Sequence, residues 1–267
     1  MLNTINRVSL LRSPHNKDSK VFEELWHINS PWFETPNVRR GGWSGVVKCM
    51  IDNFGRSEKV FIKRQENHMT RTLIHPLNGI PTFLREYHNI QLLHAINIPT
   101  LDVLYFDTKG AKAVLVTKAL EGYISLDKIE LSTLVPQDKK TLISSIAKVI
   151  RDLHKHHYQH NCLYPKHIMV RQSANGWDVK LIDLEKLKYR LVKSRAVIHD
   201  LTTFVRHLSD IWSGRDKVIF FQAYFEQSKI SCQSKNIIHT VCKKIKWKDD
   251  ARKQFESAEH PSLDSDG

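Results

Sequence analysis

The hydrophobic and polar positions follow a strand-like pattern in the first part of the chain. Short runs of β-branched and aromatic residues are separated by turn sequences, of which Asp52-Asn53-Phe54-Gly55 and Lys109-Gly110 are typical of hairpins. A helical segment is expected after Pro81. The strands that we expect are Gly45 to Ile51, Lys59 to Arg64, Asp102 to Asp107 and Ala113 to Thr117. This part of the chain therefore predicts two hairpins and a helix.

The later part is expected to be mainly helical, because its apolar residues recur at intervals of three and four. One such set is Leu142, Ile146, Val149 and Leu153, and a second is Leu201, Phe204, Val205, Leu208 and Trp212. Between these helices, Ile168 to Arg171 and Val179 to Ile182 predict a strand pair closed by a turn at Asn175-Gly176. The pattern predicts an α+β fold in which a strand-rich part precedes a helical part with one embedded hairpin.

Basic residues dominate the charge of the chain. It contains 41 lysines and arginines against 28 aspartates and glutamates, which gives a formal net charge of +13. This excess favours an anionic partner, such as nucleic acid, acidic lipid or a phosphorylated sugar, although a general effect on solubility would also account for it. The basic residues are concentrated between Lys186 and Arg195 and between Lys235 and Lys253.

The cysteines and the apolar runs favour an intracellular protein. The four cysteines are far apart and form no CxxC pair, which argues against a disulfide framework and suits a reducing cytoplasm. We find no apolar run long enough to cross a bilayer, and residues 1–20 lack the apolar core of a secretory signal. We therefore expect a cytoplasmic location.

A glycine motif lies near the start of the strand-rich part. Gly42-Trp43-Ser44-Gly45-Val46-Val47 supplies the last two glycines and the valine of the kinase phosphate loop G-x-G-x-x-G-x-V, with Arg40 at the first glycine position. Glycine lets the backbone approach a phosphate closely. Gly42 and Gly45 are therefore candidates for nucleotide binding, although a plain hairpin turn would use the same residues.

Lys63 and Glu86 are expected to form a buried ion pair. Lys63 ends Val60-Phe61-Ile62-Lys63, which matches the V-A-I-K strand whose lysine holds nucleotide phosphates in kinases. On a helix, Glu86 would lie within an apolar face, where an unpaired carboxylate would be costly. Lys63 is the natural cationic partner for it.

Two later segments match the remaining kinase motifs. His160-Asn161-Cys162-Leu163-Tyr164-Pro165-Lys166-His167 compares with H-R-D-L-x-x-x-N, and Leu181-Ile182-Asp183-Leu184-Glu185 compares with D-F-G. Asp183 is the expected Mg²⁺ ligand, and pairing of the two strands should bring His167 beside it as a second metal ligand. The candidate catalytic residues are His160, Cys162, Lys166 and Asp183.

Together these motifs predict a protein-kinase-like two-lobed fold, with a small strand-rich N-lobe and a larger helical C-lobe. We expect the N-lobe to span residues 1–120 and the C-lobe residues 121–267, with the connection near Leu120 to Gly122. Asp200 opens a predicted amphipathic helix. It would serve as the N-cap of that helix, as a brace for the catalytic loop, or as both.

At the level of family, the segments RQENHMTRTLIHPLNGIPTFLREYHN, HNCLYPKHI and LIDLEK resemble the lipopolysaccharide kinase (Kdo/WaaP) family, close to its InaA-type members. The resemblance implies transfer of the γ-phosphate of ATP, with Mg²⁺ or Mn²⁺, to a sugar hydroxyl of the lipopolysaccharide inner core or a related anionic glycan. It also implies peripheral contact with the cytoplasmic face of the inner membrane. By motif match, Lys63, Glu86, His167 and Asp183 would take nucleotide and metal roles.

Two departures from the motifs, Cys162 and the Leu184-Glu185 pair where D-F-G has Phe-Gly, leave a second function open. Cys162 stands where a kinase carries its catalytic aspartate, and loss of a general base slows a reaction by about 10²–10⁴ without excluding it. The alternative is a pseudokinase that binds nucleotide or acts as a scaffold. His167 replaces an asparagine, and imidazole suits Mn²⁺ or Zn²⁺ better than Mg²⁺. A zinc site among the neighbouring histidines lacks a recognisable spacing, and specific nucleic-acid binding lacks a recognised module.

Overall fold

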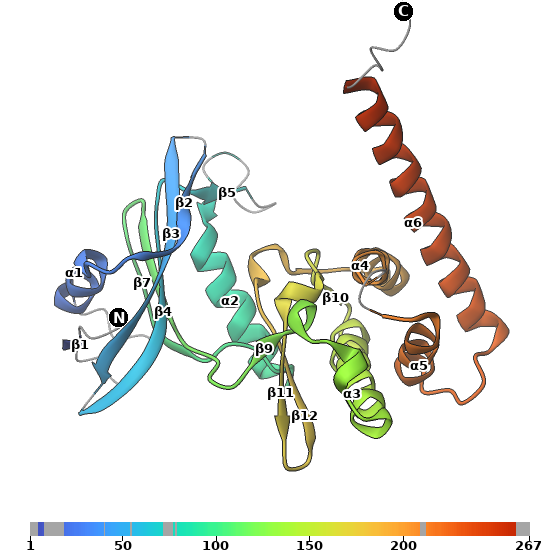
Figure 1. The fold of residues 1–267 in the computed structure, drawn as a ribbon. Coiled ribbons are helices and arrows are strands. Elements are labelled where there is room, and N and C mark those ends of the chain that lie inside the picture. Colours follow the sequence, from blue (N-terminus) through green and yellow to red (C-terminus); the bar gives the residue numbers. More distant parts are fainter. Residues whose placement is uncertain are drawn as a thin grey trace, which may run out of the picture. The chain divides into compact units, whose positions relative to one another are not determined.

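The structure is a computed structural model, and it describes residues 5–7, 19–39, 41–53, 55–71, 77, 79–208 and 212–259. Figure 1 shows its helices and strands. The chain forms two compact units. The first comprises Met1–Tyr123 and Lys180–Lys186, and the second comprises Ile124–Val179 and Leu187–Gly267.

A six-stranded sheet is the framework of the first unit. Its strands are β1 (Ile5–Arg7), β2 (Trp32–Arg39), β3 (Gly42–Asn53), β4 (Arg56–Glu66), β7 (Val103–Lys109) and β8 (Lys112–Lys118). The order along the sheet is β1-β3-β4-β8-β7, and β2 pairs with β3. The pairs β3–β4 and β7–β8 are antiparallel, which confirms both predicted hairpins, whereas β1 lies parallel to β3. Phe54 of the first predicted turn lies outside the described residues.

Two helices pack on opposite faces of this sheet, and their positions show which of the two faces carries the Lys63 side chain. Helix α1 (Ser19–His27) shares a core with Ile62 and other apolar residues of β3, β4 and β8. Helix α2 (Thr82–Ala95), which begins directly after Pro81 as predicted, lies on the other side of the sheet from α1 (Figure 1). Because successive side chains of a strand point to opposite faces, Lys63 points to the face that α2 covers.

The short helix α1 was not expected from the sequence. It has nine residues, which is too short for a helical period to stand out from its polar surroundings. Between β4 and α2 the chain forms one further small pair, β5 (Met69–Thr70) with β6 (Ile80–Pro81).

The second unit is mainly helical, as predicted. Its helices are α3 (Pro136–Lys155), α4 (Lys193–Arg206), α5 (Gly214–Phe225) and α6 (Cys232–Glu259). The predicted strand pair is present as β11 (Ile168–Ser173) and β12 (Gly176–Leu181), and β9 (Ile124–Ser125) pairs with β11 on its other edge. A second small sheet joins β10 (Tyr158–Gln159) to β13 (Lys188–Tyr189). The unit also contains the short 3₁₀ turns η1 (Leu126–Lys128), η2 (Leu131–Thr133) and η3 (Pro165–His167), whereas η4 (Leu184–Lys186) belongs to the first unit.

The second predicted helix is shorter than its apolar pattern suggested. Helix α4 ends at Arg206, so Leu208 and Trp212 lie beyond it. Both remain buried, and the Trp212 indole packs edge-on against Phe204 and Phe220. The apolar period therefore extended past the helix because Leu208 and Trp212 are buried although they lie beyond its end. Among the described residues, no helix is long and apolar enough to cross a membrane.

Candidate active site

Lys63 and Glu86 form the predicted ion pair. Lys63 Nζ lies 2.6 Å from Glu86 Oε1, and the Glu86 side chain is almost fully buried. The same ammonium lies 5.8 Å from the centre of the Phe83 ring, one helical turn before Glu86. Strand β4 and helix α2 therefore hold the Lys63 ammonium between them, as the sequence pattern predicted.

The charge of this pair is set by burial and by its neighbours. Burial alone would lower the pKa of Lys63, but the Glu86 carboxylate outweighs this effect, and the pKa of Lys63 is raised. Burial raises the pKa of Glu86, and the positive charge of Lys63 opposes that rise only in part. Lys63 is therefore a fixed cation at neutral pH, as a ligand for phosphate oxygens must be.

Asp183 lies within electrostatic reach of the pair. Its carboxylate, together with that of Glu185, acts on the pKa values of both Lys63 and Glu86. Asp183 has a left-handed backbone conformation, with φ at 61°, which aspartate tolerates better than most residues. The structure thus brings Lys63, Glu86 and Asp183 together within the first unit.

Hydrogen bonds hold the segment around Asp183 in place. The Thr100 hydroxyl donates to the Leu181 carbonyl at 2.6 Å, and the Leu181 N–H donates to the Pro99 carbonyl at 3.0 Å. On the other side of Asp183, Asn89 Nδ2 of α2 donates to the Leu184 carbonyl at 2.7 Å. The sequence did not predict this role of Asn89. Its position on α2, one turn after Glu86, was the only sign that it would lie near Asp183.

The two candidate glycines have a packing role in the structure. Both lie within β3. A Cβ atom on Gly42 would come within 2.4 Å of the Asn67 backbone, and one on Gly45 would come within 2.5 Å of the Trp32 ring. The backbone contact alone favours glycine at position 42, and at position 45 a larger residue would have to displace the Trp32 ring. Nucleotide binding by Gly42 and Gly45 therefore stays a prediction. Arg40 lies outside the described residues.

Asp200 braces the loop that contains the candidate catalytic residues. It is the eighth residue of α4 and fully buried, so the expectation that it caps this helix was wrong. Its carboxylate accepts the backbone N–H of His160 at 2.6 Å and that of Asn161 at 3.0 Å. The predicted brace is therefore confirmed. Asn161 itself has a left-handed conformation, with φ at 69°, which turns the chain into the loop.

Further buried partners surround the brace. His154 Nε2 lies 3.2 Å from Asp200 Oδ2, and His154 Nδ1 lies 2.8 Å from the Tyr224 hydroxyl. Burial alone would raise the pKa of Asp200, but hydrogen bonds from His154 and His199 outweigh it and hold that pKa far below its usual range. Burial and the charge of Asp200 raise the pKa of Tyr224. No pattern in the sequence predicted that His154 would be buried or pointed to Tyr224 as its partner.

The rest of the loop is ordered by contacts to the Cys162 backbone. The Cys162 carbonyl accepts from the Tyr164 N–H and lies near His167 Nδ1, both at 2.8 Å. Because a carbonyl only accepts, this bond places a proton on Nδ1, and in a neutral ring Nε2 then carries the lone pair that binds a metal. The Cys162 side chain is buried, whereas Lys166 is exposed.

The other histidines near this loop have separate contacts. His156 Nδ1 lies 2.9 Å from the Asp152 carbonyl, and His157 Nδ1 lies 3.1 Å from the Arg190 carbonyl. Within the described ranges, no three His, Cys, Asp or Glu side chains are grouped as a metal site would require. His167 belongs to the second unit and Asp183 to the first, so their shared metal site stays a prediction.

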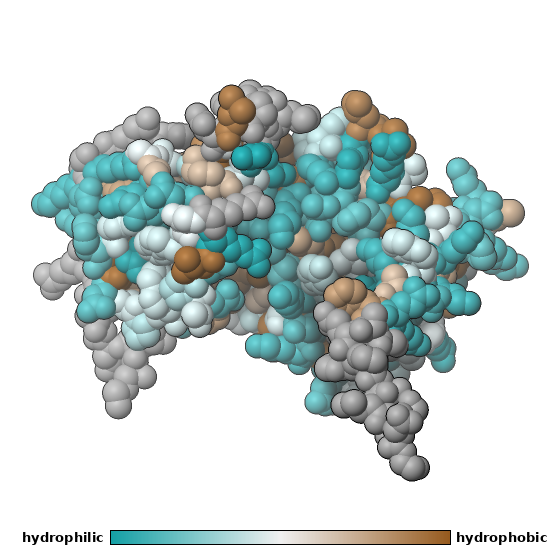
Figure 2. Space-filling view, turned by 90° about the horizontal axis from the view of Figure 1, so that it is seen from above, coloured by the Kyte–Doolittle hydropathy of each residue, from teal (hydrophilic) through white to brown (hydrophobic). Residues whose placement is uncertain are grey.

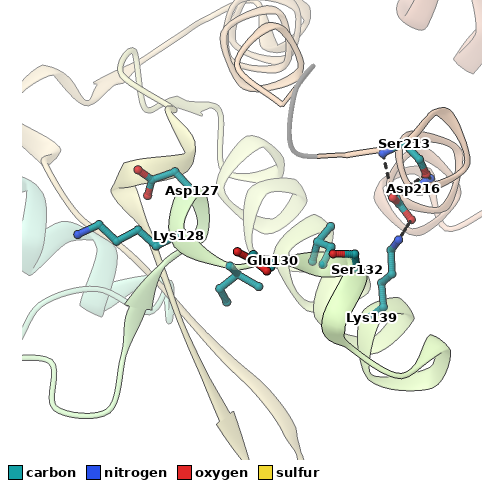
Figure 3. A pocket seen from close by; sticks show the side chains of 9 residues that line it. Asp127, Lys128, Glu130, Ser132, Lys139, Ser213 and Asp216 are labelled. Carbon is teal, nitrogen blue, oxygen red and sulfur yellow. Dashed lines mark hydrogen bonds and ion pairs between the residues drawn. The ribbon is translucent and has the colours of Figure 1, made fainter.

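A separate cavity of about 690 Å³ lies in the second unit. It is lined by residues 127–132 together with Lys139, Ser213 and Asp216 (Figure 3). Lys139 Nζ pairs with Asp216 Oδ1 at 2.9 Å, and Ser213 and Asp216 form a reciprocal cap at the start of α5. None of the predicted site residues lines this cavity.

Comparison with known proteins agrees with this architecture. The family model of the lipopolysaccharide kinase (Kdo/WaaP) family matches residues 23–224. Protein InaA of Escherichia coli (strain K12) is 28% identical over 198 residues, which cover 71% of this chain and 89% of InaA. The solved structure of WaaP in complex with acyl carrier protein matches 87% of this chain and 93% of that chain, with a TM-score of 0.64 and 19% identity.

The structural match establishes the fold, and the sequence matches establish the family. The TM-score of 0.64 confirms the predicted protein-kinase-like fold, but at 19% identity it carries no information on substrates. The family model covers most of the chain and includes every candidate site residue from Gly42 to Asp183. This protein therefore belongs to the lipopolysaccharide kinase (Kdo/WaaP) family.

Proposed function

We propose that this protein is an ATP-dependent kinase that transfers the γ-phosphate of ATP to a sugar hydroxyl of the lipopolysaccharide inner core or of a related anionic glycan. The observation that carries the proposal is the Lys63–Glu86 pair, at 2.6 Å, with Asp183 within electrostatic reach of it. Family membership supports the same class of reaction and of acceptor.

The side chains of the first unit fit ATP and a divalent metal. Glu86 keeps Lys63 charged, and an ammonium on a sheet suits the oxygens of the α- and β-phosphates. Asp183 offers carboxylate oxygen, which Mg²⁺ and Mn²⁺ prefer as a ligand. The metal would screen the negative charge of the phosphates during transfer. Neither metal is favoured over the other by these residues.

The loop of the second unit would serve the acceptor. In the transfer, the bond from the γ-phosphorus to the bridging oxygen breaks and ADP leaves, a bond to the sugar oxygen forms, and the hydroxyl proton passes to a base of the loop or to water. Asp200 holds the loop through the N–H groups of His160 and Asn161. Cys162, which follows them, stands at the motif position of the residue that would accept this proton. Lys166, which is exposed, would contact the transferred phosphate. His167 would hold a metal through Nε2.

The second candidate function is a pseudokinase, and Cys162 favours it. A thiol has an ordinary pKa of about 8.5, against about 3.9 for an aspartic acid, so it is a poor proton acceptor at neutral pH in its usual state. General-base catalysis contributes about 10²–10⁴ to a rate. In a kinase with a weakened base, Cys162→Asp would raise transfer by about that factor. In a pseudokinase, the same substitution would leave transfer undetectable.

The deciding experiment is transfer of labelled γ-phosphate from ATP to purified core-truncated lipopolysaccharide, with Mg²⁺ or with Mn²⁺. We expect the parent to transfer label and Asp183→Asn to lose transfer. Asp178→Asn is the matched control, because Asp178 lies in the preceding strand β12 and pairs with Arg171 on the surface. Equal transfer by the parent and Asp183→Asn would show that the assigned metal role is wrong. No transfer by folded parent or by Cys162→Asp would favour the pseudokinase.

A further inference from the structure

The segment after β13 exposes apolar side chains next to one another. Leu191 is 87% exposed, Val192 is 50% exposed, and Tyr189 is 55% exposed. Scattered single apolar residues on a surface are ordinary, and on the face shown in Figure 2 the hydrophobic residues form only small separate patches. Two neighbouring aliphatic side chains at a turn, with an aromatic ring two residues before, form a surface that water solvates poorly.

The same segment is strongly basic. We call residues Lys188–Arg195 the basic loop surface. It carries Lys188, Arg190, Lys193 and Arg195 and contains neither aspartate nor glutamate. Lys193 and Arg195 are exposed, and within the part of the chain that the structure describes neither forms an ion pair. Lys193 and Arg195 therefore place positive charge directly after the exposed apolar pair.

Backbone pairing holds the basic loop surface in a defined place. Tyr189 pairs with Tyr158 in the β10–β13 sheet. The Arg190 N–H donates to the His157 carbonyl at 2.8 Å, and Arg190 Nε donates to Gln159 Oε1 at 2.6 Å. Strand β10 leads directly into the loop from His160 to His167. The exposed segment is thus anchored to the strand that precedes the candidate catalytic loop.

The residues at the start of α4 do not stabilise the helix. Its N-cap is Val192, which offers no side-chain acceptor, and the first turn carries Lys193 and Arg195 without an acidic residue. Apolar residues are among the weakest N-caps, and cations at this end oppose the helix dipole. Both choices destabilise the helix start, whereas both favour contact with a surface that is apolar and negatively charged.

We propose that the basic loop surface binds an anionic lipid bilayer at its headgroup region. Leu191 and Val192 would enter the boundary between headgroups and acyl chains, while Lys193 and Arg195 would contact lipid phosphates. The aliphatic pair favours lipid over nucleic acid, because nucleic-acid backbones offer phosphates but no apolar layer, and single-stranded bases are bound chiefly by aromatic stacking. The proposal rests on the exposed apolar side chains and the positive charge of the basic loop surface, and it does not require that the protein be an active enzyme.

The connection to the acceptor rests on the proposed function. A lipid-linked glycan presents its sugar near the headgroups of the bilayer that anchors it. Docking through the basic loop surface would bring the adjoining loop from His160 to His167 to that level.

The test is sedimentation of the full chain with phosphatidylcholine vesicles that contain or lack phosphatidylglycerol. We expect the parent to bind the anionic vesicles and to bind them less as salt is raised. The variant Lys193→Gln/Arg195→Gln should bind about 30-fold more weakly, since each cation near an anionic surface contributes about fivefold. The variant Leu191→Ser/Val192→Ser should bind at least about tenfold more weakly than the parent, because less apolar area is buried in the bilayer.

Matched controls separate this surface from general charge and hydrophobicity. Val135→Ser/Val218→Ser removes two other exposed aliphatic residues, and Lys243→Gln/Lys244→Gln removes two exposed cations of α6. Both should bind like the parent. No variant should unfold below the temperature of the parent, because Val192→Ser and the loss of the Lys193 and Arg195 charges favour the start of α4. Absent vesicle binding by the parent, or equal losses in test and control variants, would overturn the proposal.

Two further results have defined meanings. Binding of the parent to duplex RNA, lost in Lys193→Gln/Arg195→Gln and without vesicle binding, would assign the surface to nucleic acid and overturn the proposal. Vesicle binding that depends on the basic loop surface, in a protein that transfers no phosphate, would support the proposal while rejecting the proposed kinase function.

Discussion

Replacement of Asp200 tests whether a single buried carboxylate sets the geometry of the candidate catalytic loop. Its two oxygens accept from the backbone of His160 and Asn161, at 2.6 and 3.0 Å, and lie 3.2 and 3.3 Å from ring nitrogens of His154 and His199. Asp200→Ala removes the acceptor for all of these groups. Asp200→Asn preserves the shape of the side chain but replaces one acceptor oxygen with a donor.

The expected loss of stability follows from these contacts. A buried donor without an acceptor costs about 1–3 kcal/mol, and Asp200→Ala leaves at least the N–H groups of His160 and Asn161 in that state. We therefore expect the free energy of unfolding to fall by about 3–5 kcal/mol in Asp200→Ala. It should fall by about 2 kcal/mol in Asp200→Asn, because one oxygen can still accept.

The pH dependence has a definite sign. The folded pKa of Asp200 lies far below the value of about 3.9 that its carboxyl has in an unfolded chain. Its contribution to stability is therefore fully present above about pH 4 and is lost as the pH falls through the folded pKa. The difference in unfolding free energy between the parent and Asp200→Asn should narrow below about pH 4 by up to about 1.4 kcal/mol per pH unit.

Urea unfolding at pH 7 and at acid pH measures these changes, and amide hydrogen exchange reports on the loop. Asp216→Asn is the matched control, since Asp216 is also buried with a lowered pKa but bonds to Ser213 and Lys139. It should lower stability without altering exchange at His160 and Asn161. If both amides stay as protected in Asp200→Ala as in the parent, the brace does not hold the loop and the reasoning is refuted.

Further substitutions test other parts of the structure. Glu86→Gln should lower the unfolding free energy by about 3–5 kcal/mol because it leaves a buried ammonium unpaired, and adding Lys63→Met should restore part of that loss in a urea double-mutant cycle. Additive losses would contradict the pairing. Gly45→Ala should cost about 1–3 kcal/mol and change tryptophan fluorescence, because its Cβ would displace the Trp32 ring. Ser213→Ala should lower stability by about 1 kcal/mol in thermal unfolding, through loss of the cap of α5, and an unchanged midpoint would argue against that cap.

Local patterns in the sequence predicted the elements whose stability is local. The turn at Asp52 to Gly55 closes its hairpin through a bond between neighbours in sequence, from the Gly55 N–H to the Asp52 side chain at 2.8 Å. The Lys63–Glu86 pair was predictable from two local patterns. Lys63 ends a recognisable strand motif, and Glu86 lies on the apolar face of a predicted helix, where a buried carboxylate requires a cation.

Contacts between residues distant in sequence could not be read in the same way. Asp200 was placed at a helix start because a single aspartate before apolar residues is typical of an N-cap, whereas α4 begins seven residues earlier at Lys193. Its partners His154 and Tyr224 come from two other helices, and no periodicity relates them. Gly45 likewise owes its identity to the Trp32 ring on a neighbouring strand.

The backbone of the loop from His160 to His167 is held by bonds that do not involve the side chain at position 162. Asp200 binds backbone N–H groups, and the Cys162 carbonyl, not its thiol, accepts from Tyr164 and lies against His167. None of these bonds depends on which side chain stands at position 162. A cysteine there is therefore compatible with a fully formed loop, and an ordered loop is not evidence for an active base. Cys162→Asp changes the proton acceptor and keeps these backbone bonds available, so a gain of phosphate transfer in that variant, in protein that unfolds at the temperature of the parent, reports on the chemistry at position 162.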